Sequence, residues 1–212
     1  MRKNIIALSL LCAALPFTAN AGLLDAVKGA ATVANSASGG SDAGSSQDAL
    51  VNAYVAANKQ VLLAQSKMAS ALGASEAAAL AKAEAESLSS GATKDNLSKA
   101  DSVQSDVSKA ISERQQAKGT KMDEASKKEY AAGLATLSQG VSQYVGLSAR
   151  LPAFQSALTS ASPLMIAKLS AGAYILKSFP NNSVNLKNTL VQAVSYAKSN
   201  DIPVPKDATA AL

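Results

Sequence analysis

The chain has 212 residues without histidine or tryptophan, and its 20 basic and 15 acidic residues give a net charge of +5. The lack of histidine, together with a single cysteine at Cys12, argues against the usual zinc sites, histidine-ligated haem and the common nucleophile systems. The mild charge, with arginine only at positions 2, 114 and 150, gives no indication of nucleic-acid binding. We therefore expect no cofactor, no metal and no nucleic-acid partner.

The first residues have the three zones of a secretory signal. Two basic residues precede an apolar run over residues 5–15, and residues 19–21 have the small-x-small pattern of a cleavage site. The apolar run is shorter than the roughly 20 residues that a membrane-spanning helix needs. The residues before Cys12 do not fit a lipidation motif. We predict a signal peptide over residues 1–21, of bacterial type, and a periplasmic or secreted protein; a retained membrane anchor is the alternative.

Two segments are predicted between the signal peptide and the main body of the chain. Residues 22–35 are expected to form a short amphipathic helix, with Leu23, Leu24 and Val27 on one side as candidates for contact with a partner or a membrane. Residues 36–46 are rich in glycine and serine, which is typical of a flexible linker. The alternative is that the short helix folds back on the main body or is disordered.

Residues 47–212 are expected to form a helical bundle. A first helix is predicted from a cap at Ser46 to about residue 72, and a second, rich in alanine, over residues 75–91. A third helix begins at Thr93, a residue type that caps helix N-termini well. Its spacing predicts a face formed by Leu97, Ala100, Gln104, Val107 and Ile111.

A fourth, long helix is expected after Gly119. Thr120 and Asp123 have the spacing of a capping box at its start, and Pro152 is expected to mark its end. The stripe predicted along this helix consists of Tyr130, Leu134, Leu137, Val141, Tyr144, Ser148 and Leu151.

Two further helices are predicted near the end of the chain. A serine–proline pair at residues 162–163 is a start signal, and the most apolar helix is expected over residues 164–179, stopped by Pro180. A last helix opens at residue 182 or 183, and the tail after residue 202 is expected to be extended. The face predicted for the last helix contains Leu186, Leu190, Ala193, Val194 and Ala197.

These patterns together indicate an all-α protein. No stretch alternates apolar and polar residues for long enough to predict a strand. Long helices joined by very short breaks must turn back on one another, so neighbouring helices are expected to be antiparallel. We predict an antiparallel up-down helical bundle of about five to seven helices, with a tethered N-terminal helix.

The sequence contains no constellation that indicates catalysis. Ser195 and Lys198 match an S-x-x-K pattern, but the companion S-D-N and K-T-G elements are missing. Acids followed four residues later by lysine, such as Asp95 with Lys99, are expected to pair on solvated helix faces. We therefore predict no catalytic residues and no enzyme.

Charge is unevenly distributed along the chain. Residues 22–139 have a net charge of −1, whereas residues 140–212 carry six basic and two acidic residues, a net charge of +4. A basic, apolar segment can lie on an anionic bilayer. However, Lys168 and Lys177 fall on opposite sides of the expected helix, which favours packing inside the bundle with the lysine stems reaching outward.

The sequence as a whole predicts an exported, non-enzymatic helical bundle that acts by binding a macromolecular partner. We expect this partner to be a protein in the cell envelope or outside the cell. One alternative is a periplasmic carrier of an apolar ligand such as a lipid, and another is a membrane-active helical protein. The residues that would hold the apolar ligand, or else form ordinary core, are Leu164, Met165, Ile166, Tyr174, Ile175 and Phe179.

Overall fold

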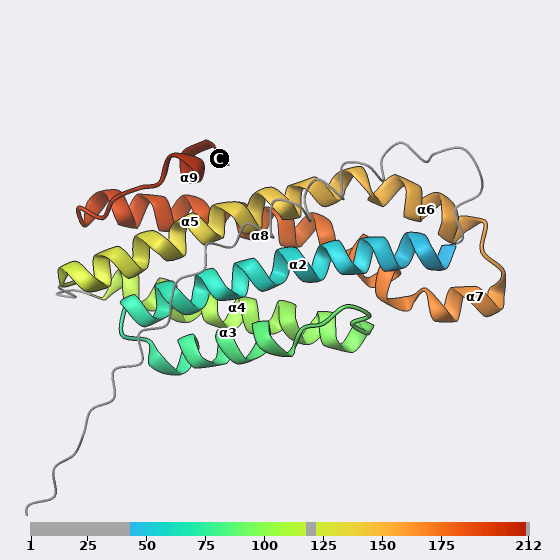
Figure 1. Cartoon of the computed structure of the whole chain (residues 1–212), viewed down its shortest axis with the longest axis horizontal. Coiled ribbons are helices and arrows are strands. Elements are labelled where there is room, and N and C mark those ends of the chain that lie inside the picture. The colour runs from blue at the N-terminus through green and yellow to red at the C-terminus, as the bar shows by residue number, and fades with distance from the viewer. Residues whose placement is uncertain (1–42, 118–121, 211–212) are drawn as a thin grey trace, which may run out of the picture. The chain divides into compact units, whose positions relative to one another are not determined.

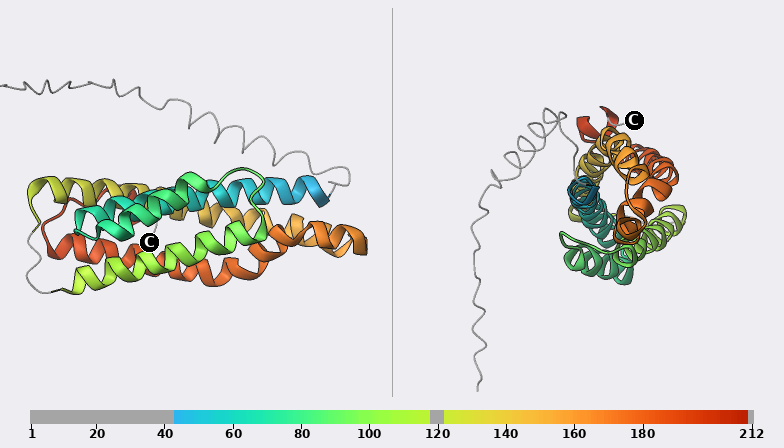
Figure 2. Two further views of the ribbon diagram at one scale, coloured as in Figure 1. Left: turned by 90° about the horizontal axis from the view of Figure 1, so that it is seen from below. Right: turned by 90° about the vertical axis from the view of Figure 1, so that its right-hand side faces the viewer.

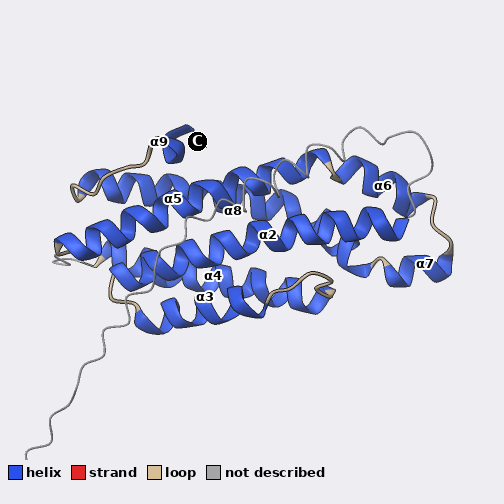
Figure 3. Ribbon diagram, viewed as in Figure 1, coloured by secondary structure: helices blue, strands red, loops and turns tan. Residues whose placement is uncertain are grey.

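The structure is a computed structural model that describes residues 43–117 and 122–210. These residues form eight α-helices and one 3₁₀-helix, with no strand among them, which confirms the predicted all-α bundle (Figures 1 and 3). The predicted signal peptide and the helix over residues 22–35 lie outside the described residues. The helices are α2 (Ala43–Ala71), α3 (Ser75–Ser87), α4 (Lys94–Gln116), α5 (Glu124–Gly146), η2 (Leu147–Ala149), α6 (Leu151–Thr159), α7 (Pro163–Lys168), α8 (Ser170–Ser199) and α9 (Lys206–Ala210).

The main helices run up and down. α2, α4 and α8 run in one direction, and α3 and α5 run in the other (Figures 1 and 2). α6 and α7 form a corner that joins α5 to α8. The described residues contain more helices than the five to seven expected, because α6, α7 and α9 are separate helices of only nine, six and five residues. None of the described helices is both long and apolar enough to cross a membrane.

The pair formed by α2 and α5 is closely packed. Gly133 and Gly140, seven residues apart on α5, both lie on the side that faces α2. A Cβ atom added at Gly133 would lie 3.0 Å from the carbonyl oxygen of Ala64, and one at Gly140 would lie 3.1 Å from the backbone nitrogen of Val61. Glycine at these two positions therefore lets the two helix backbones approach more closely than any larger residue would allow.

The predicted apolar faces are buried. All five residues predicted for the face of α4 are buried, and so are the five predicted for the last helix, now the second half of α8. In the stripe predicted for α5, the residues from Tyr130 to Tyr144 are buried, whereas Ser148 is exposed and Leu151 is half-buried. The stripe stops there because α5 ends at Gly146.

The N-terminal half differs from the prediction at two boundaries. α2 begins at Ala43, so the last four residues of the predicted linker, 43–46, are helical. α3 ends at Ser87 instead of near residue 91, and Leu88 after it is buried. The predicted start at Thr93 is confirmed. The Asn96 amide donates to the Thr93 hydroxyl at 3.3 Å, and the Thr93 amide donates to the Asn96 side chain at 3.0 Å.

The start and the end predicted for α5 are wrong. Its cap is Asp123 alone, whose carboxylate accepts a hydrogen bond from the Ser126 amide at 2.8 Å, while Thr120 lies outside the described residues. Pro152 does not end this helix but lies in the first turn of α6. Proline fits there because the first amides of a helix have no intrahelical partner.

Pro180 does not separate two helices. It lies inside α8, on an exposed side, and the helix continues through it. A proline inside a helix removes one hydrogen bond and bends the helix. The packing of Ile175 before it and Leu186 after it, both buried in the same core, offsets that cost. The tail is also not extended throughout, because α9 forms with Ala208 buried.

One charged pair differs from the expected local pairing. Lys99 forms an ion pair with Glu84 of α3 at 2.8 Å, and not with Asp95 on its own helix. Glu84 is buried, with 4% of its side chain exposed, so this pair joins α3 to α4. On α5, Lys127 contacts Glu124 at 3.8 Å.

Candidate functional site: a polar groove between α4 and α8

A groove runs between α4 and α8, which lie side by side (Figure 2). It consists of two adjoining pockets with volumes of ≈ 330 Å³ and ≈ 620 Å³ that share Asn188 and Gln192. We call it the polar groove. Its lining residues come from one side of each helix: Asp101, Gln104, Ser105, Ser108 and Gln115 on α4, and Asn182, Asn185, Leu186, Asn188, Thr189, Val191, Gln192, Ser195, Tyr196 and Ser199 on α8, with Ala117 and Asn200 just beyond the two helices.

The lining residues recur at the spacing of one helix face. In the first pocket they lie at positions 101, 104, 105 and 108 on α4 and at 182, 185, 186, 188, 189 and 192 on α8, where Leu186 is the one apolar residue. Residues three or four apart share a side of a helix, so each helix presents a polar row to the other. Asparagine, glutamine, serine and threonine make up most of both rows, and Asp101 is the only carboxylate in the lining.

Hydrogen bonds cross the groove at two places. Asn182 Nδ2 donates to Asp101 Oδ2 at 2.8 Å, and Gln192 Nε2 donates to Ser112 Oγ at 2.7 Å. The second crossing lies eleven residues further along α4 and ten further along α8. At a rise of 1.5 Å per residue, the crossings are about 15 Å apart, and the two helices run parallel.

Asp101 is the centre of a cluster at the first crossing. Its carboxylate accepts hydrogen bonds from the hydroxyl of Tyr54 at 2.7 and 2.8 Å and from the hydroxyl of Tyr174 at 2.7 Å, besides that from Asn182. Burial raises the pKa of Asp101, and the three donors lower it by a smaller amount. Burial also raises the pKa of Tyr174 to about 12, with further contributions from the hydrogen bond to Asp101 and from its charge.

The floor of the groove is a second set of hydrogen bonds, between α2 and α4. Gln65 Nε2 donates to the carbonyl oxygen of Gln104 at 3.0 Å and to Ser108 Oγ at 2.7 Å. Gln104 Nε2 donates to Asn58 Oδ1, and Asn58 Nδ2 donates to the carbonyl oxygen of Tyr54 at 3.0 Å. These bonds fix the side chains below the groove, because the side-chain NH₂ group of each of these three buried amides donates to a partner.

The rim of the groove is different from its floor. The side chains of Asn185 and Asn188 on α8 are exposed, and no hydrogen bond joins either of them to another described residue. An amide carries two N–H donors and a carbonyl acceptor, so each of these side chains is open to a ligand. Two neutral amides one helical turn apart, above a fixed polar floor, are suited to a ligand that both donates and accepts hydrogen bonds.

An aromatic ring lines the second pocket. Tyr196 is half-buried, and its ring packs against that of Tyr130 at a centroid distance of 5.4 Å. Its hydroxyl lies 3.7 Å from the sulfur of Met122. Tyrosine at such a position offers an apolar ring face beside the amides of the groove.

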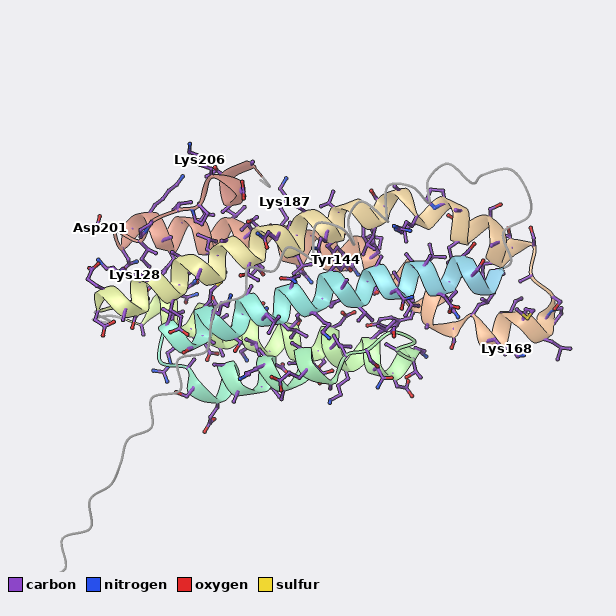
Figure 4. The ribbon with its side chains drawn as sticks, in the orientation of Figure 1. Lys128, Tyr144, Lys168, Lys187, Asp201 and Lys206 are labelled. Atoms are coloured by element: carbon purple, nitrogen blue, oxygen red, sulfur yellow. The ribbon has the colours of Figure 1, made fainter. Side chains whose placement is uncertain are left out.

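The six residues proposed for an apolar ligand are not brought together. Leu164 and Ile166 are 85% and 49% exposed, whereas Ile175 is completely buried. Met165, Tyr174 and Phe179 are half-buried, and Phe179 stacks on Tyr144, which points into the bundle, at 5.1 Å (Figure 4). None of the six lines either of the two pockets of the groove. The set is divided because the predicted single helix is interrupted at Leu169, between α7 and α8.

The other sequence-derived candidates are placed as follows. Leu23, Leu24 and Val27 lie outside the described residues. Ser195 and Lys198 are both exposed, and Ser195 lines the second pocket of the groove. Among the described residues, no group of three or more histidine, cysteine, aspartate or glutamate side chains gathers where it could hold a metal ion.

The groove is not among the predictions from the sequence. Those predictions concern the apolar face of each helix, and they include Gln104 only as part of such a face. The signal was available as a second periodic pattern, in which Asn182, Asn185, Thr189 and Gln192 recur at the spacing of one helix side. What the sequence does not contain is the pairing of that row with α4, which is far away in the chain.

The chain matches no protein-family profile, no curated protein and no solved structure.

Proposed function

We propose that this chain is an exported, non-enzymatic protein that binds a cell-envelope macromolecule in the polar groove, and that this macromolecule is an uncharged glycan. The observation that carries the proposal is the pair of facing rows of neutral amides and hydroxyls, with Asn185 and Asn188 open to a ligand. The export signal predicted over residues 1–21 would bring the protein to a compartment that contains such polymers.

Chemistry favours a glycan over the other classes of ligand. A sugar chain consists of groups that both donate and accept hydrogen bonds, which amide side chains match on both counts. Nucleic acids and anionic polymers require cations, and the groove lining contains no lysine or arginine. Apolar ligands require an apolar wall, whereas the rows are mainly polar.

A protein partner, which the sequence analysis favoured, fits the groove less well. Protein interfaces take most of their binding energy from tryptophan, tyrosine and arginine anchors in desolvated pockets. In the groove only Tyr196 is of this kind, and it lies in the second pocket beside Ser195 and Gln192. An open, polar surface of this sort matches an extended chain of sugars better, with the tyrosine ring against one sugar face.

The proposal is tested by titrating the purified chain with chitohexaose, a neutral hexamer of N-acetylglucosamine, in a calorimeter. We expect saturable binding to the wild type, and at least about tenfold weaker binding to the double variant Asn185→Ala/Asn188→Ala, because two hydrogen-bonding side chains are removed. Asn52→Ala is the matched control, since Asn52 is an exposed asparagine of α2 that does not line the groove.

Three outcomes would overturn the proposal. The first is that the wild type binds neither chitohexaose nor cellohexaose, a hexamer that carries hydroxyls but no acetamido groups. The second is that the double variant binds as tightly as the wild type. The third is that Asn52→Ala weakens binding as much as the double variant does. Tighter binding of chitohexaose than of cellohexaose supports it and assigns the recognition to the acetamido groups.

A further inference from the structure

α7 presents an apolar surface that nothing in the described residues covers. Its residues Pro163, Leu164, Ile166 and Ala167 are all exposed, and no residue of α7 is buried. Leu164 is the most exposed of the exposed large hydrophobic residues, at 85%. Single exposed apolar residues are ordinary, but here four fall within one and a half helical turns. We call these four residues the α7 tip.

The α7 tip is held in place although it buries nothing. A helix of six residues is too short to be stable alone. Leu169, directly after α7, is buried with 1% exposed. Gln47 of α2 donates to the carbonyl oxygen of Lys168 at 3.1 Å and accepts a hydrogen bond from the Gly172 amide at 3.0 Å. The tip is therefore a fixed projection, and its exposure does not come from a loose segment.

The charge around the α7 tip has one dominant sign. Residues 130–200 contain no aspartate or glutamate, so from Tyr130, in the second turn of α5, to the end of α8 every charged residue is basic. Lys168 is exposed on α7 itself, and Lys177 is exposed on the following helix. The one acid of the first turns of α2, next to Gln47, is Asp48. Lys168 lies at the end of the bundle opposite Lys128, Asp201 and Lys206 (Figure 4).

We propose that the α7 tip inserts into the surface of an anionic lipid bilayer. Leucine and isoleucine side chains would enter the boundary between headgroups and acyl chains, and Lys168, on α7 itself, would contact the anionic headgroups. Apolar residues beside cations, without acids in between, complement such a surface in both respects. If the α7 tips of two copies of the chain instead packed against each other, Lys168 of one copy would lie near Lys168 of the other, and these like charges would repel. The tip and the polar groove use different residues, so this interaction is independent of glycan binding.

The test is co-sedimentation of the purified chain with vesicles that contain phosphatidylglycerol, compared with vesicles of phosphatidylcholine alone. We expect binding to the former, weakened at high ionic strength because the headgroup attraction is screened. The double variant Leu164→Ser/Ile166→Ser should bind at least about tenfold more weakly, since its apolar insertion is lost. Lys168→Gln should have a smaller effect in the same direction.

The matched control is Val145→Ser/Val184→Ser, which changes two exposed valines on α5 and α8, 57% and 60% exposed, and should bind as the wild type does. Circular dichroism checks that each variant is folded, which is expected because all four side chains are exposed. The proposal is overturned if the wild type does not bind these vesicles, or if the tip variant binds equally well. It is also overturned if Leu23→Ser/Leu24→Ser abolishes vesicle binding while the tip variant retains it. A tip variant that converts a dimer into a monomer but still binds the vesicles would overturn it as well.

Discussion

Two helix pairs of the same bundle are built in opposite ways. α2 and α5 approach closely through Gly133 and Gly140, and residues along this contact, such as Val61 and Met68, are buried. α4 and α8 are joined at two hydrogen-bonded crossings and leave a polar groove between them. We infer that the first pair supplies stability, and under the proposed function the second supplies a surface for recognition. Each pair can be tested by changes that should leave the other intact.

The largest effect is expected at the α2–α5 contact. Gly133→Val adds a branched side chain where a Cβ already lies 3.0 Å from the carbonyl oxygen of Ala64 and 3.1 Å from the backbone nitrogen of Met68. Backbone atoms cannot rotate away, so the free energy of unfolding should fall by about 2 kcal/mol in urea denaturation. Gly146→Ala is the control, because a Cβ there has no neighbour within 4 Å. It should raise stability by about 0.5 kcal/mol. Equal stability of the two variants would contradict close packing.

A smaller effect is expected at the Asp101 cluster, and it depends on pH. Because burial raises the pKa of Asp101 in the folded chain above its ordinary value of 3.8, its contribution to stability is fully present below that value. This contribution is lost as the pH rises through the folded pKa, since the unfolded chain then releases the proton more readily. Asp101→Asn removes this dependence. The difference in free energy of unfolding between wild type and variant should therefore fall from about pH 3 to about pH 7.

Thermal denaturation at a series of pH values measures that difference. The chain has no histidine, so no side chain of that type adds a transition in the same range. A difference that rises with pH would mean that the hydrogen bonds from Tyr54, Tyr174 and Asn182 outweigh burial, and that the folded pKa lies below 3.8.

The smallest effect is expected on the rim of the polar groove. Asn185→Ala/Asn188→Ala should leave the free energy of unfolding unchanged or raise it by up to about 1 kcal/mol, because alanine is the better helix former and both side chains are exposed. Urea denaturation measures the free energy of unfolding of this double variant beside that of Gly133→Val. A loss of more than about 1 kcal/mol would show that the rim is part of the core's support and not a free surface.

Much of the fold was predictable because it depends on local sequence patterns. The apolar spacing on α4 and the cap at Thr93 depend only on neighbours within one or two turns, and both predictions are confirmed. The wrong predictions concern prolines. The sequence predicts helix ends at Pro152 and Pro180. Tertiary packing decides whether a helix continues past a proline, and Ile175 and Leu186 are buried on either side of Pro180.

The polar groove was harder to predict than the helices around it. Its two rows come from α4 and α8, which are about eighty residues apart, and their pairing is fixed by contacts such as Gln192 with Ser112. A single sequence shows each row but not which helix faces which. The exposure of Leu164 was missed for a related reason. Apolar periodicity predicts a buried face, and only the break at Leu169 separates α7 from the core.

The double hydrogen bond of Gln47 has a mechanical consequence. One side chain of α2 holds the last carbonyl of α7 and an early amide of α8, so three helices meet at one amide group. Tension applied to the chain ahead of Ala43 can therefore unwind only the first turn of α2, up to Gln47, before it loads the corner between α7 and α8. If the chain is pulled from that side while the α7 tip is anchored, the corner carries the force and the α2–α5 core is spared.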